Sequence, residues 1–426
     1  MKVSPQAEGT PPATPRAGLL DGRAIVVACV GLYLAVVAAF RSISQVDIWP
    51  WLGVPSGPSL FFDARNVAAA AECRRLGYDP LVDNPCDPWD RTIFYPRPWL
   101  ALRWAGLDQS HTVLLGVVVG VLALVALLAL LPRLTGREGL LVAAAACSPA
   151  VMFAVERANM DLVIFAGLAL AAVVWRRGSP TAQYVAVGLV LLMAVVKLYP
   201  AVALLAFLVA RRRRVAAAAA GALVVFIAYA VITREDIATI SAVATQGQYN
   251  SYGARILLGR LYHGVVGDTW AGSRTVAQAL VLVAVAGTAL VLWLVLRRRH
   301  SERPSRPPLD ETAELLAFRM GALVYLGTFV AGNSFDYRLV CLLLVLPGLL
   351  RWPRRDAAAG TSTLPPVTLG VVLLMLWIGA LSEPLMLWDE LVSWALAGLL
   401  AALLVRSVPP LRTVLRPRSA GVPARS

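Results

Sequence analysis

Long apolar runs alternate with short polar connections along almost the whole chain. The apolar runs cover residues 24–40, 112–131, 139–154, 160–175, 182–196, 198–210, 215–232, 275–296, 315–331, 338–350, 364–381 and 387–405. Runs of this kind are typical of helices that lie in a lipid bilayer. The pattern therefore predicts an all-α integral membrane protein with about twelve transmembrane or re-entrant helices.

The two ends of the chain differ from this pattern. Residues 1–20 are polar and rich in Pro, Ala and Thr, and they lack the apolar core of a signal peptide. We expect them to form a disordered cytoplasmic tail, followed by a membrane domain over 21–405. Residues 406–426 are rich in arginine and are expected to form a basic cytoplasmic tail.

Arginine clusters occur in alternate connections between the apolar runs, at 176–177, 211–214, 297–299 and 351–355. Acidic residues are more frequent in the other connections. Because cytoplasmic connections of membrane proteins are enriched in Lys and Arg, both termini are predicted to be cytoplasmic and the acidic face to be directed outward. We expect a multi-pass protein of the plasma (inner) membrane.

Two of the outward connections are long, at 41–110 and 233–273, and the others are short and polar, with the sequences VERANM, KLYP, GNSFDYR and SEPLMLWDE. The apolar runs beside VERANM and KLYP are also short. A helix of about 15 residues is roughly 22 Å long, less than the apolar thickness of a bilayer, about 30 Å. These two connections should therefore lie below the outer surface, where they line a polar chamber within the protein.

Ionisable and polar residues in these connections would then lie at membrane depth. They are Glu156, Arg157, Asn159, Asp161, Lys197, Tyr199, Asn333, Asp336, Tyr337 and Arg338. Such residues are costly in a membrane and are usually paired or functional. One interpretation is a set of internal ion pairs such as Glu156–Lys197 and Asp336–Arg338. The other is a binding site in which the cations hold a lipid-linked phosphate and the other groups bind sugar hydroxyls; one network can serve both purposes.

The first outward connection contains Asp63 at the start of a predicted helix over 64–76. Asp is common at the N-cap of a helix. The alternative is a general base that removes a proton from a sugar hydroxyl, a role that an apolar surrounding favours. The two interpretations are compatible.

Further along this connection, Asp79, Asp83, Asp87 and Asp90 lie among prolines without the spacing of a calcium loop. A solvated, proline-stiffened loop is therefore expected there. Cys73 and Cys86 lie in the same connection, where thiols are exposed to oxidation, and we predict a disulfide between them. His263 in the second long connection is a weaker site candidate.

Composition excludes several functions. Hydrophobic residues make up 58% of the chain and charged residues 15%, whereas soluble domains carry about a quarter charged residues. The net charge of +14 comes from clusters between apolar runs, so no nucleic-acid partner is expected. The sequence has no phosphate-binding loop, dinucleotide fingerprint or zinc-ligand spacing, and we expect neither a metal nor another cofactor.

Several segments resemble glycosyltransferase family 87, a family of membrane enzymes with the GT-C fold. They are YPRPW with Tyr95 and Arg97, VERANMDLVIFAG, VVKLYPAVALLAFLVARRRR and GNSFDYRLV, in that order after Asp63. Ala158 stands where the family usually has glycine. The resemblance extends over most of 24–350.

The resemblance implies an inverting transfer of a hexose, often mannose, from a polyprenyl-phosphate donor to an outward-facing lipid or glycan acceptor. The general base is then Asp63, with Asp47 as the reserve candidate. Two rival functions remain, a transporter or flippase of lipid-linked saccharides and a structural partner in a cell-envelope complex. A transporter predicts inverted repeats, and no clear internal repeat is present.

Overall fold

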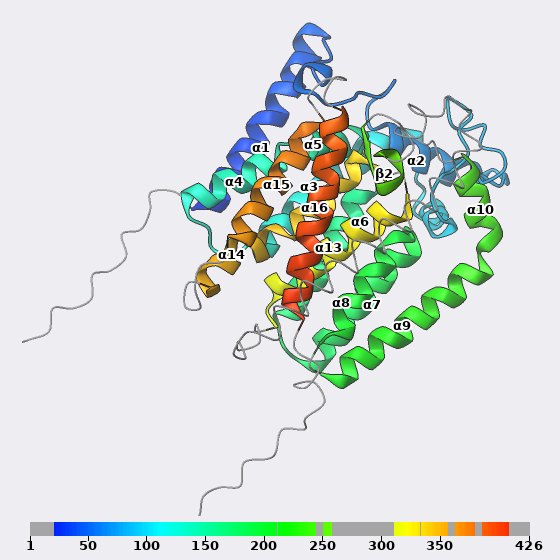
Figure 1. The fold of residues 1–426 in the computed structure, drawn as a ribbon. Helices are drawn as coiled ribbons and strands as arrows, with labels where there is room; N and C mark the ends of the chain where they lie inside the picture. The colour runs from blue at the N-terminus through cyan, green and yellow to red at the C-terminus, as the bar shows by residue number, and fades with distance from the viewer. Residues whose placement is uncertain are drawn as a thin grey trace, which may run out of the picture.

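The computed structural model describes residues 21–210, 212–243, 250–257, 311–332, 334–356, 363–379 and 386–408 (Figure 1). Helices dominate this part of the chain, which confirms the all-α class. The two predicted tails lie largely outside the described residues, as do most of the second long connection with His263, the apolar run at 275–296, and Asn333.

The first half of the chain contains α1 (Gly22–Ala39), α2 (Phe62–Arg75), α3 (Thr112–Leu130), α4 (Gly136–Ala146), α5 (Pro149–Arg157), α6 (Asp161–Trp175), α7 (Pro180–Val196), α8 (Leu205–Leu208), α9 (Arg213–Ile232) and α10 (Arg234–Val243). The second half contains β1 (Ser251–Tyr252), α13 (Ala313–Ala331), β2 (Ser334–Phe335), α14 (Leu346–Asp356), α15 (Leu364–Ile378) and α16 (Met386–Ser407). Tighter 3-10 turns cover Pro50–Leu52, Arg97–Ala105, Gln109–His111, Tyr199–Leu204 and Asp336–Leu344, and a π-helical turn covers Phe40–Ser44.

The described residues contain part of the predicted set of about twelve transmembrane or re-entrant helices. Within the described residues, five helices are long and apolar enough, or six if α4 and α5, which meet at a bend of 53°, form one broken span. The helices α6, α7 and α15 are apolar but shorter. The predicted apolar runs at 198–210 and 338–350 are helical but not regular, because each begins with a 3-10 turn and continues as α8 or α14.

The helices form a bundle with α13 near its centre (Figure 1). Helix α6 packs between α3 and α7, α1 packs on α4, and α15 packs on α16. Small residues permit the closest of these contacts. A Cβ atom at Gly139 of α4 would lie 2.4 Å from the carbonyl oxygen of Gly22 at the start of α1, so the two backbones touch, as is common between membrane helices.

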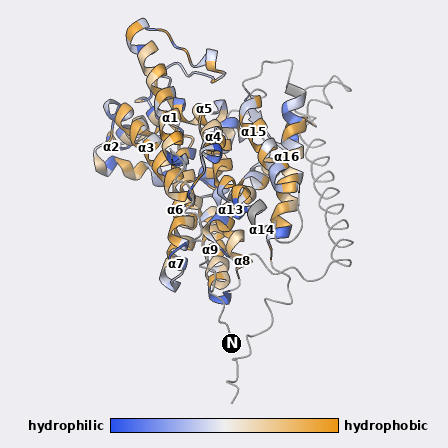
Figure 2. Cartoon of the chain, turned by 90° about the vertical axis from the view of Figure 1, so that its left-hand side faces the viewer, coloured by the Kyte–Doolittle hydropathy of each residue, from blue (hydrophilic) through white to orange (hydrophobic). Residues whose placement is uncertain are grey.

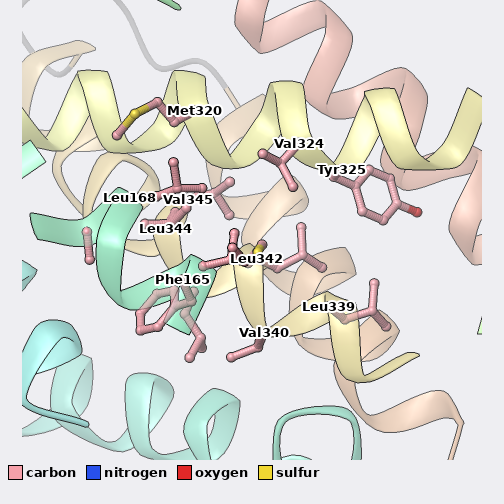
Figure 3. Close-up of a cluster of buried hydrophobic side chains, with 14 of the residues drawn as sticks. Phe165, Leu168, Met320, Val324, Tyr325, Leu339, Val340, Leu342, Leu344 and Val345 are labelled. Atoms are coloured by element: carbon pink, nitrogen blue, oxygen red, sulfur yellow. The ribbon is translucent and has the colours of Figure 1, made fainter. Parts of the chain in front are cut away.

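The centre of the bundle is apolar and brings distant segments together. Phe165 and Leu168 of α6 lie near Met320 and Val324 of α13, with the 3-10 segment Asp336–Leu344 between them (Figure 3). All four side chains are buried. This core fixes the segment that carries Tyr337 and Arg338 against α6.

The outer surfaces of several helices are also apolar. Figure 2 shows hydrophobic residues along α1, α3 and α6. Leu114 and Val125 of α3, and Val224 and Ile227 of α9, are exposed. Apolar side chains on both the inner and the outer surface are expected of helices that face lipid.

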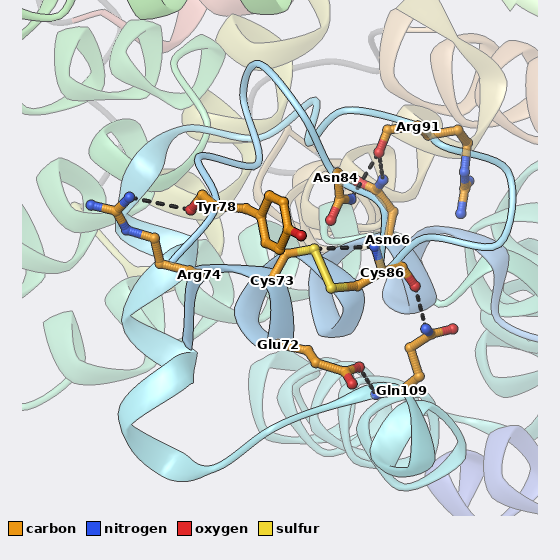
Figure 4. The surroundings of a disulfide bond; sticks show 9 residues. All are labelled: Asn66, Glu72, Cys73, Arg74, Tyr78, Asn84, Cys86, Arg91 and Gln109. Carbon is orange, nitrogen blue, oxygen red and sulfur yellow. Dashed lines mark hydrogen bonds between the residues drawn. A yellow bond between two sulfur atoms is a disulfide. The ribbon is translucent and has the colours of Figure 1, made fainter. Parts of the chain in front are cut away.

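The first long connection is folded rather than loose. Helix α2 is largely buried, and a disulfide joins its Cys73 to Cys86, the pair that the sequence predicted (Figure 4). Asn66 of α2 donates to the carbonyl oxygen of Arg91 at 3.2 Å. Asp87 is buried and binds Arg91 at 2.7 Å, so the prediction of a solvated loop is wrong at this residue.

Candidate functional site

Asp63 lies in the first turn of α2 with only 3% of its surface exposed. It does not cap the helix, because the N-cap position is Phe61 and no side chain caps it. Phe61 has a left-handed backbone, with φ of 54°, and its ring lies against α3, where a Cβ atom at Gly116 would come within 2.3 Å of it. This contact fixes the start of α2, and the Asp63 carboxylate remains available to other partners.

Those partners come from the turn between α5 and α6. Ala158 ends α5 in the left-handed conformation, with φ of 45°, and the Asn159 N–H closes the turn by donating to Ala154 at 2.9 Å. Arg157 Nη1 then lies 3.3 Å from Asp63 Oδ1, and Asn159 Nδ2 donates to Asp63 Oδ2 at 2.6 Å. The VERANM segment therefore provides two donor side chains, Arg157 and Asn159, to the carboxylate of the predicted base.

Asn159 also connects Asp63 to a second buried carboxylate. Its side-chain oxygen accepts from the backbone N–H of Asp161 at 2.9 Å and from Lys197 Nζ at 3.1 Å. Lys197 Nζ is in turn 2.7 Å from Asp161 Oδ1. Asp161 is fully buried, and burial of a charge requires such partners.

Tyr199 and Arg338 complete the surroundings of Asp161. The Tyr199 hydroxyl donates to Asp161 Oδ1 at 2.6 Å. Arg338 Nε lies 3.7 Å from Asp161 Oδ2, and its Nη1 donates to Ser334 at 2.7 Å. The predicted ion pairs Glu156–Lys197 and Asp336–Arg338 are therefore wrong, since both cations face Asp161.

Aromatic rings lie beside the cations. Lys197 Nζ is 5.0 Å from the ring centre of Tyr95 and 5.7 Å from that of Tyr337. The Arg157 guanidinium carbon is 5.0 Å from the ring of Phe153 and also faces Phe62. Burial, and then the negative charge of Asp63, raise the pKa of Tyr95 well above its usual 10, so its hydroxyl stays protonated.

We call the group of Asp63, Arg157, Asn159, Asp161, Lys197, Tyr199 and Arg338 the polar cluster. It holds three cations and two carboxylates, so it carries one excess positive charge when all five are ionised. Arg157 Nε and Arg338 Nε are buried and have no hydrogen-bond partner. Cations that are not fully neutralised in a buried site are suited to binding an anion. Across the described residues, no three His, Cys, Asp or Glu side chains are grouped as metal ligands.

Three of the charged residues predicted for the site lie outside the polar cluster. Arg97 binds Asp79 at 3.1 Å and Asp236 of α10 at 2.7 Å, so it joins the two long connections. Glu156 accepts from the Gly57 N–H at 2.9 Å. Asp336 is directed at the end of α15, where a Cβ atom at Gly379 would lie 3.0 Å from its Oδ2.

The reserve candidate and one missed residue can also be placed. Asp47 accepts from the backbone N–H of Trp49 at 3.1 Å. Ser334, which binds Arg338, was not predicted, although it lies four residues before that arginine in the polar GNSFDYR segment. Its position depends on the pairing of β2 with β1, in which Ser334 lies opposite Tyr252.

The family model of glycosyltransferase family 87 matches residues 93–324, more than half of the chain. The chain belongs to glycosyltransferase family 87. Membership of this family, together with the apolar helices, indicates a membrane glycosyltransferase, which acts on a sugar donor and an acceptor. No curated protein and no solved structure matches the chain. The family 87 match includes Arg157, Asn159, Asp161 and Lys197, whereas Asp63 precedes it.

Proposed function

We propose that the protein transfers a hexose, with mannose as the first candidate, from a polyprenyl-phosphate donor to a lipid or glycan acceptor. Asp63 is the general base, and the sugar inverts its anomeric configuration. The observation that supports this most is the continuous chain of polar contacts from Asp63 through Asn159 to Lys197 and Asp161. It joins a carboxylate suited to a base with cations suited to a phosphate in one buried network.

The phosphate of the donor would bind at the cationic part of the polar cluster. Each of the three cations, Lys197, Arg157 and Arg338, lies beside one of the two carboxylates. The three positive charges exceed the two negative ones. A phosphate that receives part of this positive charge becomes a better leaving group, because negative charge develops on its oxygen in the transition state. The ring of Tyr337, which is partly exposed and 5.7 Å from Lys197 Nζ, offers apolar surface for the sugar and the first carbons of the lipid.

The reaction is a single displacement. The acceptor hydroxyl gives its proton to Asp63 while its oxygen forms a bond to the anomeric carbon. The bond from that carbon to the phosphate oxygen breaks, its electron pair stays with the phosphate, and polyprenyl phosphate leaves. Attack opposite the leaving group converts a β-linked donor to an α-linked product, and Asp63 later releases the proton to solvent.

This scheme agrees with the predicted orientation in the plasma membrane. Lys and Arg in the alternate connections favour cytoplasmic termini. The connections that carry Asp63, Asn159 and Lys197 would then lie at the outward end of the bundle. A lipid-linked donor reaches this side through the bilayer, so no soluble nucleotide sugar is required there.

The proposal is tested with purified protein in lipid nanodiscs, given radiolabelled polyprenyl-phosphate mannose and a lipid extract as the acceptor source. We expect a labelled glycolipid product with the wild-type chain. Asp63→Asn should lower the rate by roughly 100- to 10,000-fold, the usual contribution of a general base. The matched control is Asp83→Asn, an exposed carboxylate in the same connection, which should keep full activity.

Three outcomes would contradict the proposal. Asp63→Asn with a rate near that of the wild-type chain would remove Asp63 as the base. Transfer from a nucleotide sugar but not from the lipid-linked donor would remove the proposed donor class. Movement of the unaltered donor lipid across the bilayer, without a new glycosidic product, would favour the transporter instead.

A further inference from the structure

Two buried polar groups beside Asp63 take no part in the polar cluster described above. Glu156 is 3% exposed, and its Oε1 accepts from the Gly57 N–H at 2.9 Å, whereas its Oε2 is buried without a hydrogen-bond partner. The Ser59 hydroxyl is also buried without a partner. Buried polar groups are nearly always hydrogen-bonded, so two such groups on neighbouring segments indicate a place for a ligand.

Contacts of Gly57 link the segments that carry both groups to the start of α2, where the proposed base lies. Glu156 precedes Arg157, which contacts Asp63. Gly57, which holds Glu156, packs against Phe62, the residue before Asp63, since a Cβ atom at Gly57 would lie 3.0 Å from Phe62 Cβ. The turn that contains Gly57 and Ser59 therefore joins Glu156 to the start of α2.

Charge divides the surroundings of Asp63 into two parts. In one part, Asn159 connects Asp63 to Lys197, and Arg338 lies beside Asp161. These two cations suit a phosphate. In the other, Glu156 and Ser59 have oxygen atoms that would accept hydrogen bonds from hydroxyl groups. The Arg157 guanidinium next to Glu156 disfavours a cationic ligand such as an amino group, so an uncharged ligand with several hydroxyls fits best.

We propose that Glu156 and Ser59 form the acceptor subsite and bind hydroxyl groups of a sugar, so that a neighbouring hydroxyl of the same sugar reaches Asp63. This inference rests on the proposed function and specifies it further: the acceptor is a glycoside or glycolipid whose reacting end is an uncharged sugar. A carboxylate and a hydroxyl together can bind two adjacent hydroxyl groups of one sugar ring. Binding of this kind orients a third hydroxyl of the same ring toward the base.

Binding of sugars without the donor tests the subsite apart from catalysis. The probes are methyl α-D-mannopyranoside, methyl β-D-glucopyranoside, methyl β-D-galactopyranoside and methyl α-D-arabinofuranoside. Their binding to the protein in nanodiscs is measured by saturation-transfer NMR, and binding of farnesyl phosphate is measured in parallel. Glu156→Gln should weaken the best-bound glycoside by roughly 10-fold or more, and Ser59→Ala by a smaller factor, as expected for loss of a charged and a neutral hydrogen bond. Farnesyl phosphate should bind all variants equally.

The control is Glu72→Gln. Glu72 also accepts a backbone N–H, that of Gln109, at 3.3 Å, but it lies nine residues after Asp63 on α2, about 13 Å along the helix. This variant should bind the glycoside like the wild-type chain. Unchanged glycoside binding in Glu156→Gln, or equal losses for glycoside and farnesyl phosphate, would overturn the inference; so would a wild-type chain that binds none of the four glycosides.

The two proposals fail in different ways. If the wild-type chain transfers no sugar from the lipid-linked donor but loses glycoside binding in Glu156→Gln, the proposed donor and reaction are wrong and the sugar subsite stands. If transfer depends on Asp63 while Glu156→Gln leaves the KM for the acceptor unchanged, the subsite is wrong and the proposed function stands.

Discussion

Asn159 donates a hydrogen bond of 2.6 Å to Asp63, a residue 96 positions earlier in the chain. The same side chain accepts from Lys197 through its oxygen. The amide thus holds the proposed base at one end and a cation of the proposed phosphate site at the other. Its two ends require different chemistry, a donor and an acceptor, and the side-chain amide of Asn supplies both in one neutral group.

Replacing Asn159 by Asp should therefore reduce activity strongly without a change in side-chain size. The new carboxylate cannot donate to Asp63 when ionised, and the two acidic groups repel each other at this distance. We expect kcat to fall by roughly 10- to 100-fold, the range for loss of a hydrogen bond to a charged group. Steady-state kinetics in nanodiscs measures this, with thermal unfolding to check the fold. A variant with the kcat of the wild-type chain would show that Asn159 does not position Asp63.

Lys197 can be tested by chemical modification because the chain has one other lysine, Lys2. Reductive labelling with pyridoxal phosphate should modify Lys197 slowly, since only 13% of its side chain is exposed. Farnesyl phosphate should protect Lys197 from labelling and leave Lys2 unaffected, as read by mass spectrometry of the peptides. Equal labelling of Lys197 with and without farnesyl phosphate would contradict a role in phosphate binding.

Ala158 is in the left-handed conformation and is fully buried. This conformation costs a residue with a side chain about 1–2 kcal/mol, whereas glycine adopts it freely. Ala158→Gly should keep activity and have equal or higher thermal stability. Ala158→Val should be destabilised, because a β-branched side chain is unfavourable in this conformation. The reverse order of stability in thermal unfolding would show that packing, rather than backbone conformation, decides at this position.

The disulfide between Cys73 and Cys86 joins residues 13 positions apart. A cross-link that closes a loop of about 15 residues stabilises a fold by about 3 kcal/mol in the chain-entropy model. Removing it with Cys73→Ala and Cys86→Ala together should lower the unfolding temperature and also the activity, since α2 carries Asp63. Cys29→Ala, which removes a free and partly exposed thiol of α1, is the control and should change neither. An active double variant with unchanged stability would contradict this structural role.

Sequence patterns predicted the residues of the polar cluster better than their partners. Arg157, Asn159, Asp161 and Lys197 stand out because they are charged or amide side chains in short connections between apolar runs. Asp63 stands out at the start of a predicted helix in a long connection. Their pairing was predicted wrongly, since Lys197 binds Asp161 and not Glu156. The left-handed turn at Ala158 directs neighbouring side chains to different partners. The amino-acid sequence does not show in which direction each side chain points.

The sequence alone determined the membrane class, the helical content and the segments at which polar residues interrupt the apolar runs. Hydrophobic periodicity and charge are local properties of the chain, so they can be read without a structure. Only the tertiary structure decided that Arg97 joins the two long connections and that Glu156 faces Gly57. Contacts between residues so far apart in sequence depend on how α2, α5, α6 and α7 pack together, and that packing is a property of the whole bundle.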